Sequence, residues 1–131
     1  FLKRRGALAP ILEALEVDKY DLVVSEPILL ELRETLNKRR IKLKHLLTDE
    51  AIETYALLIM SFGQWVKPEQ TLKVCRDPDD NRILEAAVAG DANYIVTGDN
   101  DLLEMNPYEG IRIVRPAEFL RALDEAKRDA E

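Results

Sequence analysis

Apolar and polar positions alternate along the first half of the chain in a pattern that predicts short helices separated by strands. Leucine and isoleucine recur at helical spacing over residues 7–16, and the polar run 18–21 ends this helix. The apolar run 22–24 predicts a buried strand. Ser25 is the expected N-cap of the next helix, which continues through 28–36 and frays into the basic residues that follow.

The second half of the chain continues this alternation. Thr48 begins a helix that closes near Gly63, and Asp77 begins another that closes at Gly90. Beyond Gly90 the expected elements are a strand at 94–97, a short helix at 101–105, a strand at 111–114 and a helix at 117–128. Helices that alternate with short, β-branched strands predict an α/β layer sandwich around a mainly parallel sheet, in one domain over residues 1–131.

Composition narrows the chemistry that such a domain can perform. The 131 residues are 47% hydrophobic and 34% charged, which suits one folded domain with a real core. The single cysteine, Cys75, and the single histidine, His45, argue against disulfides, cysteine clusters and multi-histidine metal sites. No apolar run approaches the roughly 18 residues of a membrane span, so we expect a cytoplasmic protein without a membrane partner. Any demanding chemistry therefore depends on carboxylates.

Charge is divided unevenly between the two parts of the chain. Residues 1–47 carry 10 basic and 7 acidic side chains, a net charge of +3, whereas residues 48–131 carry 9 and 18, a net charge of −9. The basic groups concentrate in the runs 3–5 and 38–45. Such runs either lie against phosphates or are solvated helix ends. The residues expected to contact phosphates are Arg39, Arg40, Lys42 and Lys44.

Six aspartates crowd into residues 77–101, at the two ends of the apolar runs there. Asp99 and Asp101 follow an expected strand, and ligands of open parallel sheets bind beyond the carboxyl ends of strands. Asp80 lies in the first turn of a helix that precedes that strand. Glu31 lies in an otherwise apolar helical segment, where a carboxylate needs a partner. Carboxylates that converge from several segments suit Mg²⁺ or Mn²⁺ and metal-assisted phosphodiester chemistry.

Each of these polar residues also has a purely structural interpretation. Asp77 and Asp79 are most simply a helix cap and a charge favoured by the helix dipole. Asp80, Asp99 and Asp101 can likewise stabilise the starts of helices. Two hydroxyl residues, expected either to cap turns or to support water in the site, are Ser25 and Thr97.

Three segments together resemble a known family: 25-SEPILLELRETL-36, 76-RDPDDNRILEAAVAGDANYIVTGDNDLL-103 and 111-IRIVRPAEFL-120. They resemble the PIN domain family, in the branch that holds the toxin components of toxin-antitoxin pairs. The resemblance covers most of the chain. It implies a three-layer α/β/α sandwich and an endoribonuclease that depends on Mg²⁺ or Mn²⁺. It also implies RNA as substrate, an antitoxin protein as partner and a homodimer by analogy.

The family's acidic residues carry over to this chain position by position. The resemblance gives the metal-binding and catalytic roles to a helix glutamate, to an aspartate near 79–81 and to an aspartate at the end of a strand. Asp79 is a secondary metal ligand because the register near Asn81 can shift by one residue. The expected catalytic residues are Glu31, Asp80, Asp99 and Asp101, with Glu31, Asp80, Asp99 and Asp79 as metal ligands.

The chain departs from the family pattern at its start. The family's first acid ends an N-terminal strand in the middle of the sheet, whereas this chain starts at Phe1 without that strand. If the strand is absent, we expect weak or no nuclease activity and exposed strand edges that favour dimers. Two other functions stay open: a non-catalytic module that binds RNA or a protein partner, and a phospho-acceptor domain with acids at a strand end.

Overall fold

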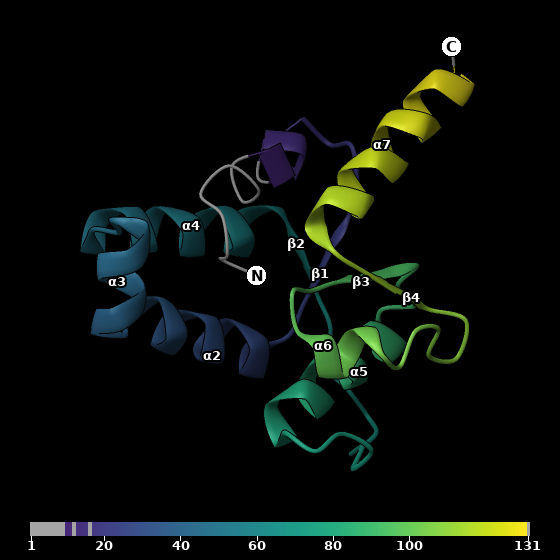
Figure 1. Ribbon diagram of the computed structural model, residues 1–131, viewed down its shortest axis with the longest axis horizontal. Helices are drawn as coiled ribbons and strands as arrows, with labels where there is room; N and C mark the ends of the chain where they lie inside the picture. The colour runs from purple at the N-terminus through teal and green to yellow at the C-terminus, as the bar shows by residue number, and fades with distance from the viewer. Residues whose placement is uncertain (1–9, 12, 16, 131) are drawn as a thin grey trace.

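The computed structural model describes residues 10–11, 13–15 and 17–130, with the side chains of residues 45, 129 and 130 outside the description. The basic run 3–5 and part of the first expected helix also lie outside the described residues. Helices and strands alternate along the chain as the hydrophobic pattern predicts (Figure 1). In chain order they are β1 (Leu22–Val24), α2 (Glu26–Asn37), α3 (Arg39–His45), α4 (Asp49–Phe62), β2 (Gly63–Trp65), α5 (Pro78–Ala89), β3 (Tyr94–Val96), α6 (Asn100–Leu103), β4 (Arg112–Val114) and α7 (Pro116–Ala130).

The first half of the chain forms a parallel strand pair covered by helices. β1 pairs with β2 in parallel, with Val24 opposite Trp65. α4 begins where predicted, because the Thr48 hydroxyl accepts a hydrogen bond of 3.0 Å from the backbone N–H of Ala51. It ends at Gly63, where a Cβ atom would lie 2.6 Å from Cγ2 of Val24. Only glycine therefore lets the chain leave α4 and run directly beside β1.

The basic residues after α2 do not fray, contrary to the sequence-based expectation. The helix stops at Lys38, which has extended backbone angles (φ −62°, ψ 130°), and α3 begins immediately after it. An ion pair joins Lys42 of α3 to Asp49 of α4 across this corner. The basic run is therefore a separate short helix that turns the chain from α2 into α4.

The second half of the chain packs around α5, whose apolar side chains meet both β3 and β4. Leu84 of α5 has no exposed surface, and it packs with Ile95 of β3 and Ile113 of β4. β3 and β4 are parallel, with Ile95 opposite Ile113. Asp77 caps α5 and Gly90 closes it, as the sequence predicts. None of the described helices has both the length and the apolar character needed to cross a membrane.

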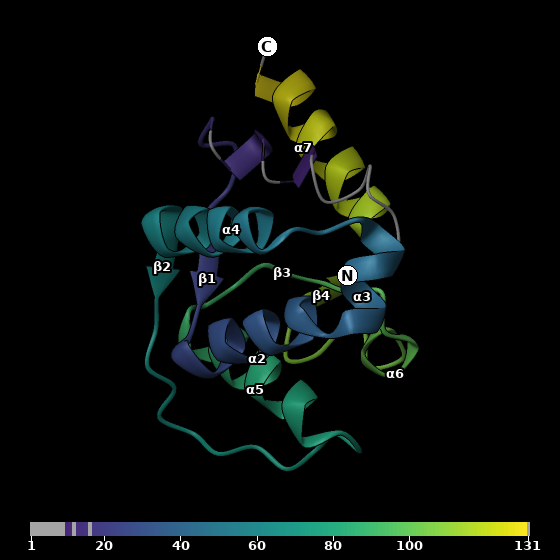
Figure 2. The same cartoon turned by 90° about the vertical axis from the view of Figure 1, so that its left-hand side faces the viewer.

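The four strands form two parallel pairs, and α5 lies against both pairs. In both views the strands lie between α4 and α7 on one side and α2 and α5 on the other (Figures 1 and 2). β1 pairs only with β2 and β3 only with β4 within the described residues, while α5 contacts both β1 and β3. The prediction of an α/β fold with parallel strands is confirmed. The described strands do not, however, join into the single central sheet that the sequence predicts.

Candidate active site

The site is built around the first turn of α5. Oδ1 of Asp77 accepts a hydrogen bond of 3.0 Å from the backbone N–H of Asp79, which confirms Asp77 as the helix cap. Pro78 follows at the first helical position, where its missing N–H leaves no donor unsatisfied. Asp79 is exposed, whereas Asp80 is only 7% exposed. The cap therefore fixes the first turn of α5, in which Asp79 is exposed and Asp80 is buried.

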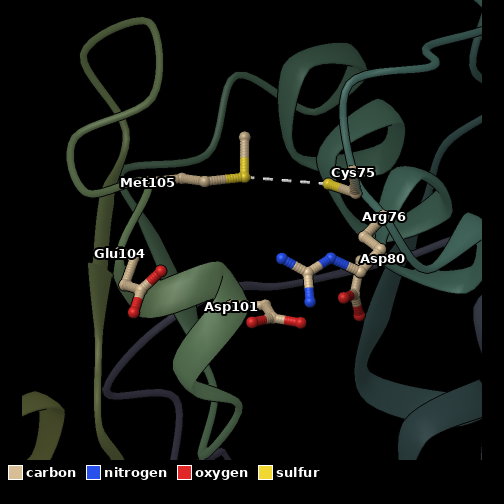
Figure 3. Close-up of a pocket in the computed structure, with 6 residues that line it drawn as sticks. All are labelled: Cys75, Arg76, Asp80, Asp101, Glu104 and Met105. Atoms are coloured by element: carbon tan, nitrogen blue, oxygen red, sulfur yellow. Dashed lines mark hydrogen bonds between the residues drawn. The ribbon is translucent and has the colours of Figure 1, made fainter.

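Asp80 faces a small pocket between the start of α5 and α6. The pocket has a volume of about 130 Å³, and Figure 3 shows the carboxylates of Asp80 and Asp101 directed into it from these two helices. Glu104 at the end of α6 adds a third carboxylate. The lining residues are Cys75, Arg76, Asp80, Asp101, Glu104 and Met105. The structure thus brings two of the predicted acids, Asp80 and Asp101, to one hollow.

The pKa of Asp80 is raised by burial and by the carboxylates around it. Its pKa is raised from the ordinary 3.8 to about 6, first because burial disfavours the charged form and then because neighbouring carboxylates repel it. Four acids contribute to this repulsion: Asp99, Asp77, Glu31 and Asp101. Acids from α2, from the start of α5 and from the start of α6 therefore contribute to one negative electrostatic field at Asp80.

Asp99 is both a helix cap and a member of this field. One of its carboxylate oxygens, Oδ1, accepts a hydrogen bond of 2.9 Å from the backbone N–H of Asp101. Its own N–H donates to the hydroxyl of Thr97, a residue only 8% exposed, at 3.0 Å. Oδ2 takes part in none of the hydrogen bonds found among the described residues, so the cap leaves it available for a ligand. Thr97 positions Asp99 through the backbone.

Glu31 joins the field from the neighbouring helix. It is half-buried on α2, which contacts α5. Burial raises the pKa of Glu31, and the charges of Asp79 and Asp77 raise it further, while Lys38 acts in the opposite direction. The segment that carries Glu31 is less buried than its apolar sequence suggests, because Leu30 is 54% exposed.

Ser25 occupies the predicted N-cap position of α2, yet its side chain makes no capping hydrogen bond. The residue is 1% exposed, and its Oγ atom has no hydrogen-bond partner among the described residues. A buried hydroxyl normally requires a partner. The side chain of Ser25 therefore does not cap α2, and its role in supporting water in or near the site stays a prediction.

Two buried polar residues of α5 were not identified as functional in the sequence. Oδ1 of Asn81 accepts hydrogen bonds from the backbone N–H groups of Val74 (3.1 Å) and Cys75 (2.9 Å). Oε2 of Glu85 accepts one of 2.7 Å from the N–H of Leu72. Both side chains hold the loop before α5 against the helix. The side-chain oxygen of Asn81 is thus engaged with the loop, whereas Asp80 is the residue of the 79–81 segment that lines the pocket.

Replacing Asn81 with alanine is expected to lower the free energy of unfolding by about 1–3 kcal/mol, because two part-buried backbone donors lose their acceptor. Denaturant unfolding monitored by circular dichroism measures this loss. Asn93→Ala, at an exposed asparagine, is the matched control and is expected to change stability by less than about 0.5 kcal/mol. Equal stabilities of the two variants would contradict the anchoring role.

The predicted RNA-binding residues are not brought to this pocket. Arg39, Arg40, Lys42 and Lys44 lie on α3, which Figure 1 places at the far end of α2, away from α5 and α6. The charge of Lys42 is also compensated by its ion pair with Asp49. A contact of these residues with RNA remains a prediction, for a part of the surface remote from the acids.

The carboxylate oxygens are the kind of ligand that a divalent cation prefers, but among the described residues they are not arranged as a complete metal site. Within the part of the chain that the structure describes, no three His, Cys, Asp or Glu side chains are grouped closely enough to hold a metal ion. Hard cations such as Mg²⁺ nevertheless bind through one or two carboxylates, with waters or phosphates as the other ligands. Buried Asp80, surrounded by like charges, is a donor that such a cation would stabilise. The residues therefore fit this kind of ion.

Comparison with known proteins relates the chain to a family of domains. A family model described as PIN domain matches residues 1–101. The matched range includes Glu31 and every acid of the 77–101 segment. No curated protein and no solved structure matches the chain significantly.

Proposed function

The chain belongs to the PIN domain family, and from this premise we propose that it is an endoribonuclease that hydrolyses RNA phosphodiester bonds with Mg²⁺ or Mn²⁺, as the toxin of a toxin-antitoxin pair. PIN domains are commonly nucleases and generally depend on divalent metals. One observation of this chain carries the proposal. Buried Asp80 lines a pocket together with Asp101, and its pKa is raised in part by the charges of Glu31 and Asp99.

The proposed roles follow from where each acid lies. Asp80, Asp99 and Glu31 would hold the ion, because they approach from three different elements. Asp101 would orient the attacking water from the pocket wall, and Asp79 is a secondary ligand beside Glu31. When bound, the ion would activate water and neutralise the charge that develops on the leaving oxygen.

Thr97 and Ser25 support the acids in this proposal. Thr97 fixes the backbone of Asp99 through its hydroxyl, so that the cap and the free Oδ2 atom keep one orientation. The unpartnered hydroxyl of Ser25 lies at the start of α2, two turns before Glu31, where it is suited to hold a water molecule. Neither residue needs to change its protonation.

The toxin role brings partners into the proposal. An antitoxin protein would hold the nuclease inactive, and a homodimer would form by analogy with the family. A three-layer sandwich with one central sheet, which the family resemblance implies, would arise if a further strand joined β1 to β3. The free edges of these two strands within the described residues, and the contact of α5 with both, support that arrangement.

Cleavage of single-stranded RNA in the presence of Mn²⁺ tests the proposed function. We expect cleavage that stops when a chelator is added and falls steeply in Asp99→Asn, because the uncharged amide binds a hard cation poorly. Asp124→Asn, an exposed aspartate on α7, is the matched control and should cleave like the wild type. Cleavage that is insensitive to both the chelator and Asp99→Asn would contradict the proposal.

One observation favours a second candidate, a non-catalytic module that binds RNA or a protein. No three potential ligands among the described residues are grouped for metal binding, and Asp77 and Asp99 already serve as helix caps. Titration calorimetry with Mg²⁺ or Mn²⁺ separates the two candidates. The nuclease requires binding of the metal ion, whereas absence of binding would favour the non-catalytic module.

A further inference from the structure

Arg76 is an exposed cation that lines the acidic pocket, and the proposed function gives it no role. It lines the pocket together with Asp80 and Asp101. Figure 3 shows its guanidinium group extending into the hollow, toward the carboxylates of these two residues. The ion pairs found among the described residues are Arg33–Glu53, Lys42–Asp49 and Arg82–Glu85, and none of them includes Arg76. The guanidinium thus lies among acids without pairing with one.

The backbone next to Arg76 is anchored, although its side chain forms no ion pair with the described residues. The preceding residues Val74 and Cys75 both donate to the Asn81 side chain, which is only 5% exposed. Glu85, 7% exposed, accepts a hydrogen bond from the backbone N–H of Leu72, which precedes Arg76 by four residues. Two buried polar groups therefore fix the loop at the point from which Arg76 reaches into the pocket. Such support is typical of a side chain that must be presented in one place.

The pocket needs a cation if a phosphodiester is to enter it. Three carboxylates and one guanidinium line it, so its own charge repels a phosphate anion. A guanidinium presents several N–H donors in a planar fork that matches two oxygens of one phosphate. Since none of the ion pairs among the described residues includes Arg76, these donors are available to a ligand that enters the pocket.

We propose that Arg76 is a substrate-contacting residue, which binds the non-bridging oxygens of the scissile RNA phosphate beside Asp80 and Asp101. This inference rests on the proposed nuclease function. Its alternative is that Arg76 only compensates the charge of the acids. The two roles predict different results. Loss of a counter-ion would strengthen metal binding, whereas loss of a phosphate contact would lower kcat/KM for RNA cleavage.

Steady-state cleavage of RNA at saturating Mn²⁺ by Arg76→Gln tests the inference. We expect kcat/KM to fall by about 10- to 100-fold, as for the loss of one charge-assisted hydrogen-bonding group. Arg76→Lys should recover part of the loss, because it keeps the charge without the fork. Arg121→Gln, at an exposed arginine on α7, is the matched control and should leave kcat/KM unchanged. Wild-type kcat/KM in Arg76→Gln, with tighter Mn²⁺ binding, would overturn the inference.

RNA binding separates failure of this inference from failure of the nuclease function. If the wild type cleaves no RNA with Mn²⁺, the proposed function fails, and fluorescence anisotropy with labelled single-stranded RNA then decides the role of Arg76. A phosphate contact predicts weaker binding by Arg76→Gln and a salt dependence whose slope is smaller by about 1. Equal affinity and equal salt dependence in the wild type and Arg76→Gln would overturn the inference in that case as well.

Discussion

Asparagine in place of Asp80 is expected to remove metal-dependent RNA cleavage and, at the same time, to make the metal-free protein more stable. Asp80 is the most buried of the predicted ligands and faces the pocket directly. Loss of its charge should lower kcat/KM by about 100-fold or more, since stabilisation by a bound ion is worth several kcal/mol. The nearly isosteric amide keeps the shape of the site.

The gain in stability follows from the sign of the pKa shift. In the folded protein the pKa of Asp80 is about 6, above its ordinary 3.8. Between these values the folded state binds more protons than the unfolded state, so the free energy of unfolding falls as pH rises from about 4 to 6. Asp80→Asn removes this loss, and we expect a gain of about 1–2 kcal/mol at pH 7.5 after allowance for solvent screening.

Denaturant unfolding across pH 4–8, in the presence of chelator, measures the change in stability. The RNA cleavage assay measures the loss of activity. Asp124→Asn removes an exposed aspartate on α7 and should change neither activity nor stability. Two outcomes would contradict the account: a stability of Asp80→Asn that is lower than that of the wild type at pH 7.5, or cleavage at the wild-type rate.

Mn²⁺ is expected to stabilise the wild-type protein strongly at pH 7.5 and weakly at pH 5. An ion at 100 times its Kd adds about 2.7 kcal/mol to the free energy of unfolding, which corresponds to a rise in Tm of about 10 °C for a chain of this size. At pH 5 only about a tenth of Asp80 is ionised, so protons compete with the ion. Differential scanning calorimetry measures both shifts.

Mg²⁺ should give the same pH dependence, since both ions use oxygen ligands. The matched variant is Asp80→Asn, for which we expect a small and pH-independent shift. A shift in Tm of the wild type that is as large at pH 5 as at pH 7.5 would show that the ion binds elsewhere.

Most of the helices and strands could be predicted because their signals are local. The cap at Thr48 and the residues Asp77, Pro78 and Gly90 that bound α5 act within one helical turn, so the sequence shows them directly. α3 was missed because a run of basic residues does not show the apolar period of a packed helix. Strand pairing joins residues far apart in the chain, and three-residue strands carry no register of their own, so the two separate pairs could not be foreseen.

The sequence also indicated only part of the candidate site, because some of its residues carry local signals and others depend on long-range contacts. The family resemblance selected Glu31, Asp80 and Asp99, and the charges of Glu31 and Asp99 raise the pKa of Asp80, while their role as metal ligands stays a prediction. The anchoring role of Asn81 and the proposed role of Arg76 depend on the loop before α5, which has no hydrophobic period and packs against that helix through part-buried hydrogen bonds. A polar side chain on the buried face of a helix was the available signal for Asn81, because such a group needs a partner.

Isothermal titration of Mn²⁺ into the protein at pH 7.5 tests the central claim, that the acids of α2, α5 and α6 form one cation site. The account predicts saturable binding to the wild type and to Asp124→Asn, and a loss of affinity of at least about tenfold in both Asp80→Asn and Asp99→Asn. Absence of Mn²⁺ binding to the wild type, or equal affinity in all four proteins, would contradict it.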